Sequence, residues 1–306
     1  MRIEDLAKNQ GKNQNLNVKK GQIDRCSQYP TNGEAKPQDT TQHSGGGYKV
    51  TIEYSHAQGE IETNHYDRVI NATGFRFDAG IFSSDCTPDL HIQEKFPKMT
   101  NWFESVNVPR VYFCGALMQS NAYRKCTSAF IHGFRYGVRS LFNHLAEKYE
   151  GIPMPQTQLK LDPERICDFI INRINRSSAL WQQFSYEADC LTVDLENCQA
   201  IYYYEIPRPC LLESVVLSEK KCFVITLEFG HCEEPFEIPR MPYPEAAEKS
   251  VFLHPVIEHY SNGKQVDSLH LLENLFGEWK EKAHVEHLLM FLKKYLMPKR
   301  SASFSG

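Results

Sequence analysis

The sequence has no C-x-x-C pair and no long apolar run, and its positive and negative charges nearly balance. Without closely spaced cysteines, a zinc ribbon or a thioredoxin-type dithiol has no support. No apolar stretch approaches the roughly 20 residues of a membrane-spanning helix. No apolar run follows the first residues of the chain either, so we expect neither a membrane span nor a signal peptide. The formal net charge of −4 argues against a nucleic-acid partner.

The composition is that of a globular protein with a substantial core, because 41% of the 306 residues are hydrophobic and 24% are charged. This length favours two domains. The ten cysteines allow two interpretations. Five of them, from Cys190 to Cys232, have a spacing that allows disulfides in an oxidising compartment. The alternative is that they are small buried hydrophobic residues.

Residues 1–47 contain few large apolar side chains and end in Gly45-Gly46-Gly47. We expect most of this segment to be flexible, with the glycines as a linker or as the entry to a hairpin. A first folded domain is predicted at 48–150, where a glycine and two prolines then mark a boundary. An α+β domain is predicted at 151–298, followed by a tail at 299–306.

Alternating or β-branched runs predict strands in the first domain at 48–54, 61–66, 67–74 and 110–115. The last two are short and end at a glycine, which is typical of buried strands whose ends approach a ligand. A helix follows, with Thr127 or Ser128 as its N-cap. Its predicted apolar face consists of Phe130, Phe134, Val138, Leu141 and Leu145.

The predicted α+β domain begins with a helix, since Asp162-Pro163 is a helix start. Strands are predicted at 191–195, 200–206 and 222–229, and Asn262-Gly263 predicts a turn. Two helical stripes end the domain. Their apolar residues are Leu269, Leu272, Leu275, Phe276 and Trp279 in the first stripe, and Val285, Leu288, Leu289, Leu292 and Leu296 in the second.

The strand–loop–helix unit from Arg110 to Leu145 carries the main chemical signal. A helix N-terminus beside the end of a buried strand presents free N–H groups and a positive dipole, which suit an anion or a nucleotide. The alternative is a purely structural connection between a strand and a helix.

Three runs carry a family resemblance. Tyr66-Asp-Arg-Val-Ile-Asn-Ala-Thr-Gly-Phe-Arg-Phe-Asp78 resembles the Ala-Thr-Gly segment of flavin-containing monooxygenases and related two-dinucleotide flavoproteins. Val111-Tyr-Phe-Cys-Gly115 resembles their second FAD motif. The run from Tyr123 to Tyr136 resembles more narrowly the FAD-dependent oxidoreductase domain-containing protein 2 family, the ER flavoproteins associated with degradation. This narrower resemblance covers about residues 60–295.

The resemblance implies an α/β fold in which a partial FAD/NAD(P)-binding, Rossmann-like domain precedes the α+β domain. It also implies FAD and NADPH as cofactors, the endoplasmic reticulum lumen as location, and ER degradation factors and misfolded glycoproteins as partners. At the flavin ring, a helix N-terminus would stabilise negative charge. The residues implied at the cofactors are Ala72, Thr73 and Gly74 between the nucleotide sites, Gly115 and Ala116 by the phosphate–ribityl region, and Ser128, Ala129, Phe130 and Ile131 at the flavin ring.

The sequence also departs from the family pattern. Ala116 stands where the family has an aspartate, and neither of the family's two G-x-G-x-x-G motifs occurs here. We therefore expect the chain to be the C-terminal part of a longer protein, or a shortened form of it. We also expect that the chain alone does not retain FAD and is inactive.

Several polar residues allow a functional and a structural interpretation. His284 and His287 lie one helical turn apart, but no third metal ligand is recognisable, so we expect a solvated face and no metal site. His132 is either a proton carrier or a structural histidine. The basic residues that either contact phosphates or are surface charges are Arg124, Lys125, Arg135 and Arg139.

Asn175-Arg-Ser177 is an N-glycosylation sequon, which a lumenal chain would use. Asn71-Ala-Thr73 also matches, but its predicted position at a buried strand end leaves it unmodified. We expect a FAD-dependent, NADPH-using oxidoreductase that assists the degradation of misfolded glycoproteins. The alternatives are a non-catalytic adaptor in ER-associated degradation without a complete FAD site, and a cytosolic relative of the monooxygenases.

Overall fold

The computed structural model describes residues 35–42, 46–54, 60–70, 76–123, 125–213, 221–231 and 240–297. The chain divides into two compact units, one of residues 1–75 and one of residues 76–306. The domain limits expected from composition remain predictions. No helix in the described part of the chain combines the length and the apolar content needed to cross a membrane.

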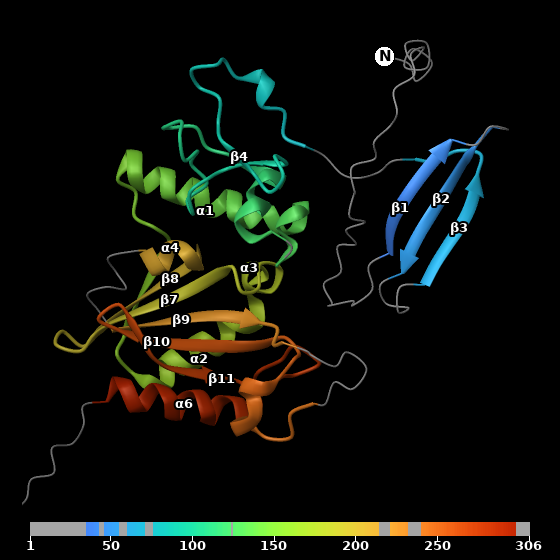
Figure 1. The fold of residues 1–306 in the computed structure, drawn as a ribbon. Coiled ribbons are helices and arrows are strands. Elements are labelled where there is room, and N and C mark those ends of the chain that lie inside the picture. The colour runs from blue at the N-terminus through green and yellow to red at the C-terminus, as the bar shows by residue number, and fades with distance from the viewer. Residues whose placement is uncertain are drawn as a thin grey trace, which may run out of the picture. The chain divides into compact units, whose positions relative to one another are not determined.

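The first unit contains a three-stranded antiparallel sheet in the order β1-β2-β3 (Figure 1). Its strands are β1 (Ala35–Gln42), β2 (Tyr48–Tyr54) and β3 (Glu60–Tyr66). The strands predicted at 48–54 and 61–66 are therefore confirmed. Because Gln42 pairs with Tyr48 in the β1–β2 hairpin, the glycines lead into a hairpin, as one of the two interpretations had it. β1 itself was not predicted, because its residues are polar.

The second unit is built on a six-stranded sheet in the order β11-β10-β9-β7-β8-β6, and every neighbouring pair is antiparallel. The three strands predicted here coincide with β7, β8 and β9. Asn262 and Gly263 have φ values of 52° and 72° and form the predicted turn between β10 and β11. The strands are β6 (Gln156–Lys160), β7 (Glu187–Asp194), β8 (Gln199–Pro207), β9 (Lys221–Glu228), β10 (His254–Ser261) and β11 (Lys264–His270).

Helices cover both faces of this sheet (Figure 1). On one face α2 (Pro163–Arg176) and α6 (Lys282–Leu296) pack against each other. On the other, α1 (Ile131–Glu150) and α4 (Arg208–Glu213) contact β8. The start of α2 follows from the sequence, since Asp162 Oδ1 accepts the N–H groups of Glu164 and Arg165 as predicted.

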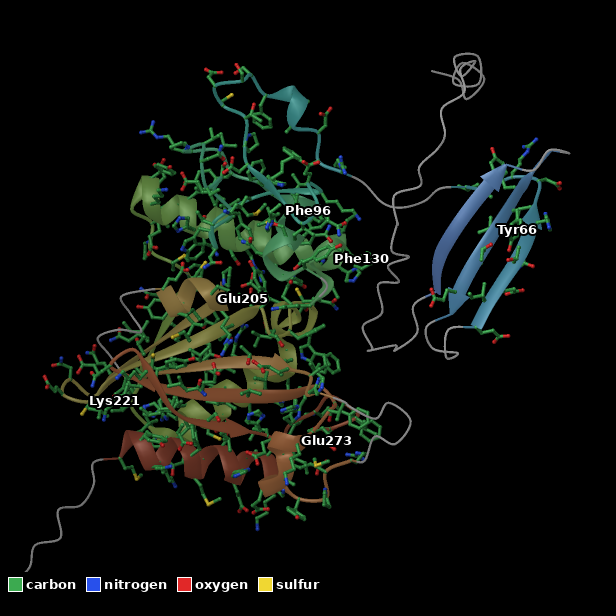
Figure 2. All side chains as sticks on the ribbon, in the orientation of Figure 1. Tyr66, Phe96, Phe130, Glu205, Lys221 and Glu273 are labelled. Carbon is green, nitrogen blue, oxygen red and sulfur yellow. The ribbon has the colours of Figure 1, made fainter. Side chains whose placement is uncertain are left out.

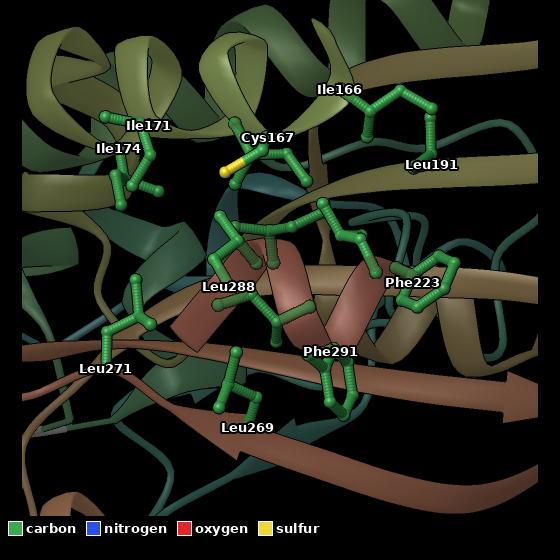
Figure 3. Close-up of a cluster of buried hydrophobic side chains, with 14 of the residues drawn as sticks. Ile166, Cys167, Ile171, Ile174, Leu191, Phe223, Leu269, Leu271, Leu288 and Phe291 are labelled. Atoms are coloured by element: carbon green, nitrogen blue, oxygen red, sulfur yellow. The ribbon is translucent and has the colours of Figure 1, made fainter. Parts of the chain in front are cut away.

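The larger core cluster lies between the sheet and the pair α2–α6. Figure 3 shows Ile166 and Cys167 of α2 and Leu288 and Phe291 of α6 in this cluster. Successive residues of β9 alternate between the faces: Phe223 belongs to this cluster, whereas the residues beside it lie in the cluster under α1 and α4. Each fully buried side chain of this size stabilises the fold by about 1.5–3 kcal/mol.

Residues 76–123 form short elements that pack on α1. They are η3 (Ala79–Ile81), β4 (Leu90–His91), β5 (Phe96–Pro97) and η4 (Gly115–Ala122). A third cluster, which includes Phe103, Phe113 and Met118, joins them to Leu141 of α1. The remaining short helices are η5 (Thr127–Ala129), α3 (Ser178–Gln182) and η6 (Pro244–Lys249).

Two predicted strands are wrong. Residues 67–70 form no strand and are exposed, with Ile70 91% accessible, and 71–74 lie outside the described residues. In the run 110–115, Tyr112 forms only an isolated bridge to Glu104. The run 110–115 is joined to residues 103–105 by two backbone bonds, from the Ser105 N–H to the Val111 carbonyl at 2.7 Å and from the Phe113 N–H to the Phe103 carbonyl at 2.9 Å. This pairing is too short to form a strand.

The helix predicted from Leu269 to Trp279 is also wrong. Leu269 belongs to β11, and Leu275 and Phe276 lie in a loop, where they are 61% and 91% accessible. The helical spacing was coincidental: the buried Leu269 side chain belongs to a strand, and the buried Trp279 side chain belongs to a loop. The second stripe is confirmed as α6. The mixed α/β class is thus confirmed, whereas a Rossmann-like sheet remains a prediction.

Candidate functional site

The predicted flavin-facing residues surround the N-terminus of α1. Ser128 and Ala129 lie in η5, Phe130 is the N-cap of α1, and Ile131 is its first residue. No side chain caps the helix, and its first turn contains no acidic residue. The Phe130 carbonyl accepts the N–H groups of Gly133 and Phe134 at 2.9 and 2.8 Å. This N-terminus therefore has positive partial charge that no side chain neutralises.

The prediction that Thr127 or Ser128 caps α1 is wrong, because both hydroxyls bond elsewhere. Thr127 Oγ1 donates to the Gln182 carbonyl at 2.5 Å, and Ser128 Oγ donates to Gln183 Oε1 at 2.6 Å. Both residues are buried. These bonds fasten η5 to the end of α3.

Cys126 belongs to the same anchor. Its thiol lies 2.8 Å from Gln183 Oε1, and burial raises its pKa. A buried thiol with a raised pKa is a poor nucleophile. Cys126 therefore contributes to the position of η5.

Gly133 allows η5 and α1 to approach closely. A Cβ at this position would lie 2.0 Å from the Thr127 carbonyl oxygen. Any larger residue would have to displace backbone, which costs more than displacing the end of a side chain. The close approach of η5 to α1 therefore requires a glycine at this position.

Gly115 and Ala116 begin η4, which contacts both η5 and α1. Gly115 has a φ of 74°, a left-handed conformation that favours glycine. A Cβ there would meet no atom within 4 Å, and Ala116 is exposed. The elements that carry Gly115 and Ala116 and those that carry the predicted flavin-facing residues therefore pack together. Ala72, Thr73 and Gly74 lie outside the described residues.

Apolar side chains accompany the free N–H groups. Figure 2 shows Phe130 at the start of the helix. Phe130 is 42% accessible, and Ile131, the next residue, is 74% accessible. The Phe130 and His132 rings stack with centroids 5.4 Å apart. An exposed apolar edge beside uncapped amides fits a flat aromatic ligand with an electron-rich edge, so the residues fit the flavin that the resemblance implies.

The predicted apolar face of α1 is confirmed only in part. Leu141 is buried and Leu145 packs against the third core cluster, but Phe130 and Val138 are exposed. The buried face contains small residues such as Gly133 and Gly137, which let the helix approach η4 and η5 closely. Four larger apolar residues of α1 are exposed and form what we call the outer stripe: Ile131, Val138, Phe142 and Tyr149.

A buried carboxylate network under α1 was not predicted. Asp189 is fully buried and accepts the N–H of Glu205 and the hydroxyl of Tyr202 at 2.8 and 2.9 Å. Glu187 is also fully buried, and its Oε1 accepts the Ser140 hydroxyl at 3.0 Å. Burial raises the pKa of Glu187 to about 8, against the Ser140 hydroxyl and the charge of Arg139, which lower it.

Of the four basic residues considered for phosphate contacts, Arg135 and Arg139 line one pocket, described below. Lys125 is exposed, and Arg124 lies outside the described residues. His284 is buried, so the expected solvated face is wrong for this residue. No group of three potential metal ligands exists within the described ranges.

The sequon residues are engaged in the fold. Asn175 Oδ1 accepts the N–H of Trp279 at 2.9 Å, and Ser177 is buried as the N-cap of α3. Modification of Asn175 remains a prediction. The described cysteines are free thiols. Of the five from Cys190 to Cys232, the hydrophobic interpretation is confirmed for Cys190, Cys210 and Cys222, which are buried, and wrong for Cys198, which is exposed. Cys232 lies outside the described residues.

Comparison with known proteins places these features in context. A Danio rerio protein named FAD-dependent oxidoreductase domain-containing protein 2 is 27% identical over 255 residues, which cover 76% of this chain and 37% of the relative. A Mus musculus protein of the same name is 34% identical over 208 residues, which cover 64% of this chain and 31% of the relative. The chain thus spans about a third of the length of the curated relatives it matches.

No protein-family model and no solved structure matches the sequence. The two relatives nevertheless match over most of the chain and bear the name of the family whose motifs the sequence resembles. The chain is accordingly related to the family of FAD-dependent oxidoreductase domain-containing protein 2.

Proposed function

We propose that the chain forms part of a FAD-dependent oxidoreductase and contributes the N-terminus of α1 to the flavin site. The carrying observation is the uncapped start of this 20-residue helix, with exposed Phe130 and Ile131 beside it. When bound there, FAD would supply two-electron redox chemistry. The chain's own groups would bind and orient it: the N–H groups of Ile131 and His132 would face its electron-rich edge, and the Ile131 side chain would exclude water from one side.

The outer stripe supports the view that more polypeptide completes this site. Its four residues are spaced by seven, four and seven positions, so they follow one side of α1. Such an apolar line on a solvent-facing helix marks an interaction surface. The sequence contains no G-x-G-x-x-G motif for a pyrophosphate, and polypeptide docked on the outer stripe would supply one.

The finer expectations from the resemblance belong to the same proposal. NADPH acts as the reductant, and the protein works in the endoplasmic reticulum lumen on the degradation of misfolded glycoproteins. FAD dependence is supported by the relatives' names; the remainder rests on the motif resemblance alone. Endoglycosidase sensitivity of the cellular protein tests the lumenal location, because glycans are added there.

An adaptor without redox activity is the second candidate. Ala116 cannot supply the carboxylate that the family places by the ribityl chain, and the exposed outer stripe would serve protein binding equally well. The two candidates differ in whether flavin is retained once the site is complete.

The test uses purified chain, alone and co-expressed with the mouse relative lacking its matching region. We expect no stoichiometric flavin absorbance from the chain alone and flavin retention from the complex. Ile131→Glu places a negative charge at the proposed flavin edge and should lower retention at least tenfold, a change of about 1.4 kcal/mol or more.

The matched control is Ile81→Glu, because Ile81 in η3 is also 74% accessible. This variant should retain flavin as the unmodified complex does. A complex that forms but never retains flavin favours the adaptor. Equal losses in both variants would refute the assignment of the α1 N-terminus.

A further inference from the structure

A pocket of about 460 Å³ opens where α1, the C-terminal end of α2, α3 and β8 meet. Four arginines from two helices surround one carboxylate in it. Figure 2 shows this carboxylate, Glu205, on the side of the sheet toward α1. We call it the arginine pocket, and its lining residues are Arg135, Tyr136, Arg139, Arg173, Arg176, Ser177, Ser178, Ala179 and Glu205.

Two of the arginines are neutralised by carboxylates. Arg173 donates from Nε to Asp189 Oδ2 at 2.8 Å and from Nη2 to Glu205 Oε1 at 3.1 Å. Arg139 pairs with the other oxygen, Glu205 Oε2. These two guanidinium groups and two carboxylates balance in charge, so they leave the pocket with no net charge of their own.

The other two arginines have no carboxylate partner among the described residues. Arg135 donates from Nη2 to the Tyr136 hydroxyl at 2.7 Å, and its guanidinium lies 4.8 Å from the Tyr136 ring centroid. Arg176 is the last residue of α2 and is exposed. The pocket therefore carries an excess of two positive charges.

The backbone at the centre of the pocket is strained. Glu205 has a φ of 52°, which is rare for a residue other than glycine. The pairing of β7 with β8 shifts register between Ala188 and Cys190, opposite this point. The buried Asp189 carboxylate accepts the Glu205 N–H, and the Ser140 hydroxyl oxygen lies 3.0 Å from the Glu205 carbonyl oxygen. Strain held in place by buried bonds is concentrated at ligand sites.

We propose that the arginine pocket binds the phosphate group of a small phosphomonoester. Such a group carries close to two negative charges at neutral pH, which match the excess of two positive charges. Guanidinium groups form paired hydrogen bonds with phosphate oxygens. The Glu205 carboxylate faces the same pocket, but it is held by Arg139, Arg173 and the Ser177 hydroxyl.

A phosphate does not fill the pocket. Sites for small molecules enclose about 300–1,000 Å³, and at about 460 Å³ this pocket has room for an organic group attached to the phosphate. A carboxylate ligand would leave one positive charge unmatched. This inference does not depend on FAD binding, because none of its residues lies among the proposed flavin contacts.

The experiment titrates the full chain at one pH and one salt concentration by calorimetry. The probes are inorganic phosphate, phenyl phosphate and its singly charged methyl ester, and the pair NADP⁺ and NAD⁺, which differ by a 2′-phosphate. We expect phenyl phosphate to bind at least tenfold more tightly than its methyl ester. Tighter binding of NADP⁺ than of phenyl phosphate would identify a nucleotide as the source of the phosphate. Tighter binding of phenyl phosphate would identify a small phosphorylated metabolite instead, and either result supports the proposal.

Two variants remove the unmatched charges without touching the buried network: Arg135→Gln and Arg176→Gln. Each should weaken binding of phenyl phosphate about tenfold, since each removes a charge-assisted hydrogen bond. The control is Arg165→Gln on α2, an exposed arginine outside the pocket, with a change below twofold. No binding by the unmodified chain, equal binding of ester and diester, or equal effects of all three variants would each overturn the proposal.

Discussion

The buried carboxyl of Glu187 makes the stability of the second unit depend on pH in a defined direction. Its pKa is about 8 in the fold, against 4.5 for an unperturbed glutamate, because burial disfavours the charged form. Between these values the unfolded chain ionises this group while the fold keeps it protonated. The unfolded state then binds fewer protons, so stability falls as the pH rises.

The magnitude follows from the two pKa values. Each pH unit in this interval lowers the free energy of unfolding by about 1.4 kcal/mol, which amounts to roughly 4–5 kcal/mol by pH 8. Glu187→Gln keeps an oxygen acceptor for the Ser140 hydroxyl and cannot ionise. The variant should therefore lack this decline and exceed the unmodified chain in stability at pH 8.

Urea unfolding from pH 5 to 8.5, followed by tryptophan fluorescence, measures this difference. Trp102, Trp181 and Trp279 are the chain's tryptophans and all lie within residues 76–306, so the signal reports that unit. Ser140→Ala removes a hydroxyl that lowers the pKa of Glu187, so the decline should extend to higher pH. Parallel pH curves for the unmodified chain and Glu187→Gln would refute the reasoning.

Three further predictions concern packing, acid stability and thiols. Gly133→Ala should destabilise the fold by about 1–3 kcal/mol in urea. Gly137→Ala should cost less, because the nearest atom to its Cβ would be the end of the Met118 side chain, at 3.2 Å; equal costs would contradict the close approach at η5. Burial lowers the pKa of His259 from 6.5 to about 4, so the free energy of unfolding should fall as the pH falls through this range. His259→Phe should abolish that loss, and an unchanged midpoint of acid unfolding in the variant would contradict this prediction. Cys114 and Cys198 should react with a thiol reagent in the folded chain, and Cys167 only after unfolding, as mapped by mass spectrometry; labelling of native Cys167 would show that its burial is wrong.

Local signals predicted the elements whose causes are local. Asp162 accepts two backbone N–H groups at the start of α2, and Asn262-Gly263 supplies the two positive φ values of a tight hairpin turn. The buried strands β7, β8 and β9 were visible as apolar or alternating runs. In each case the residues that determine the structure are neighbours in the sequence.

The orientation of α1 and the buried network depended on tertiary contacts. Periodicity assigns the largest apolar residues to the core, whereas α1 buries Gly133 and Gly137 because η4 and η5 approach so closely. Asp189 and Glu205 are brought together by a register shift between β7 and β8, which no spacing in the sequence reveals. The site residues at the start of α1 were found through motif resemblance, not through their own pattern.

Every side of α1 has a separate role, and this limits how its sequence can change. The inner side requires small residues such as Gly133, the outer stripe is apolar, and Arg135 and Arg139 face the arginine pocket. Residues three or four apart lie on the same side of a helix, so a substitution anywhere on α1 lies on or next to a side with one of these roles. Surface helices usually tolerate exchange on their solvent side; α1 offers little such freedom, so divergence between relatives should accumulate outside it.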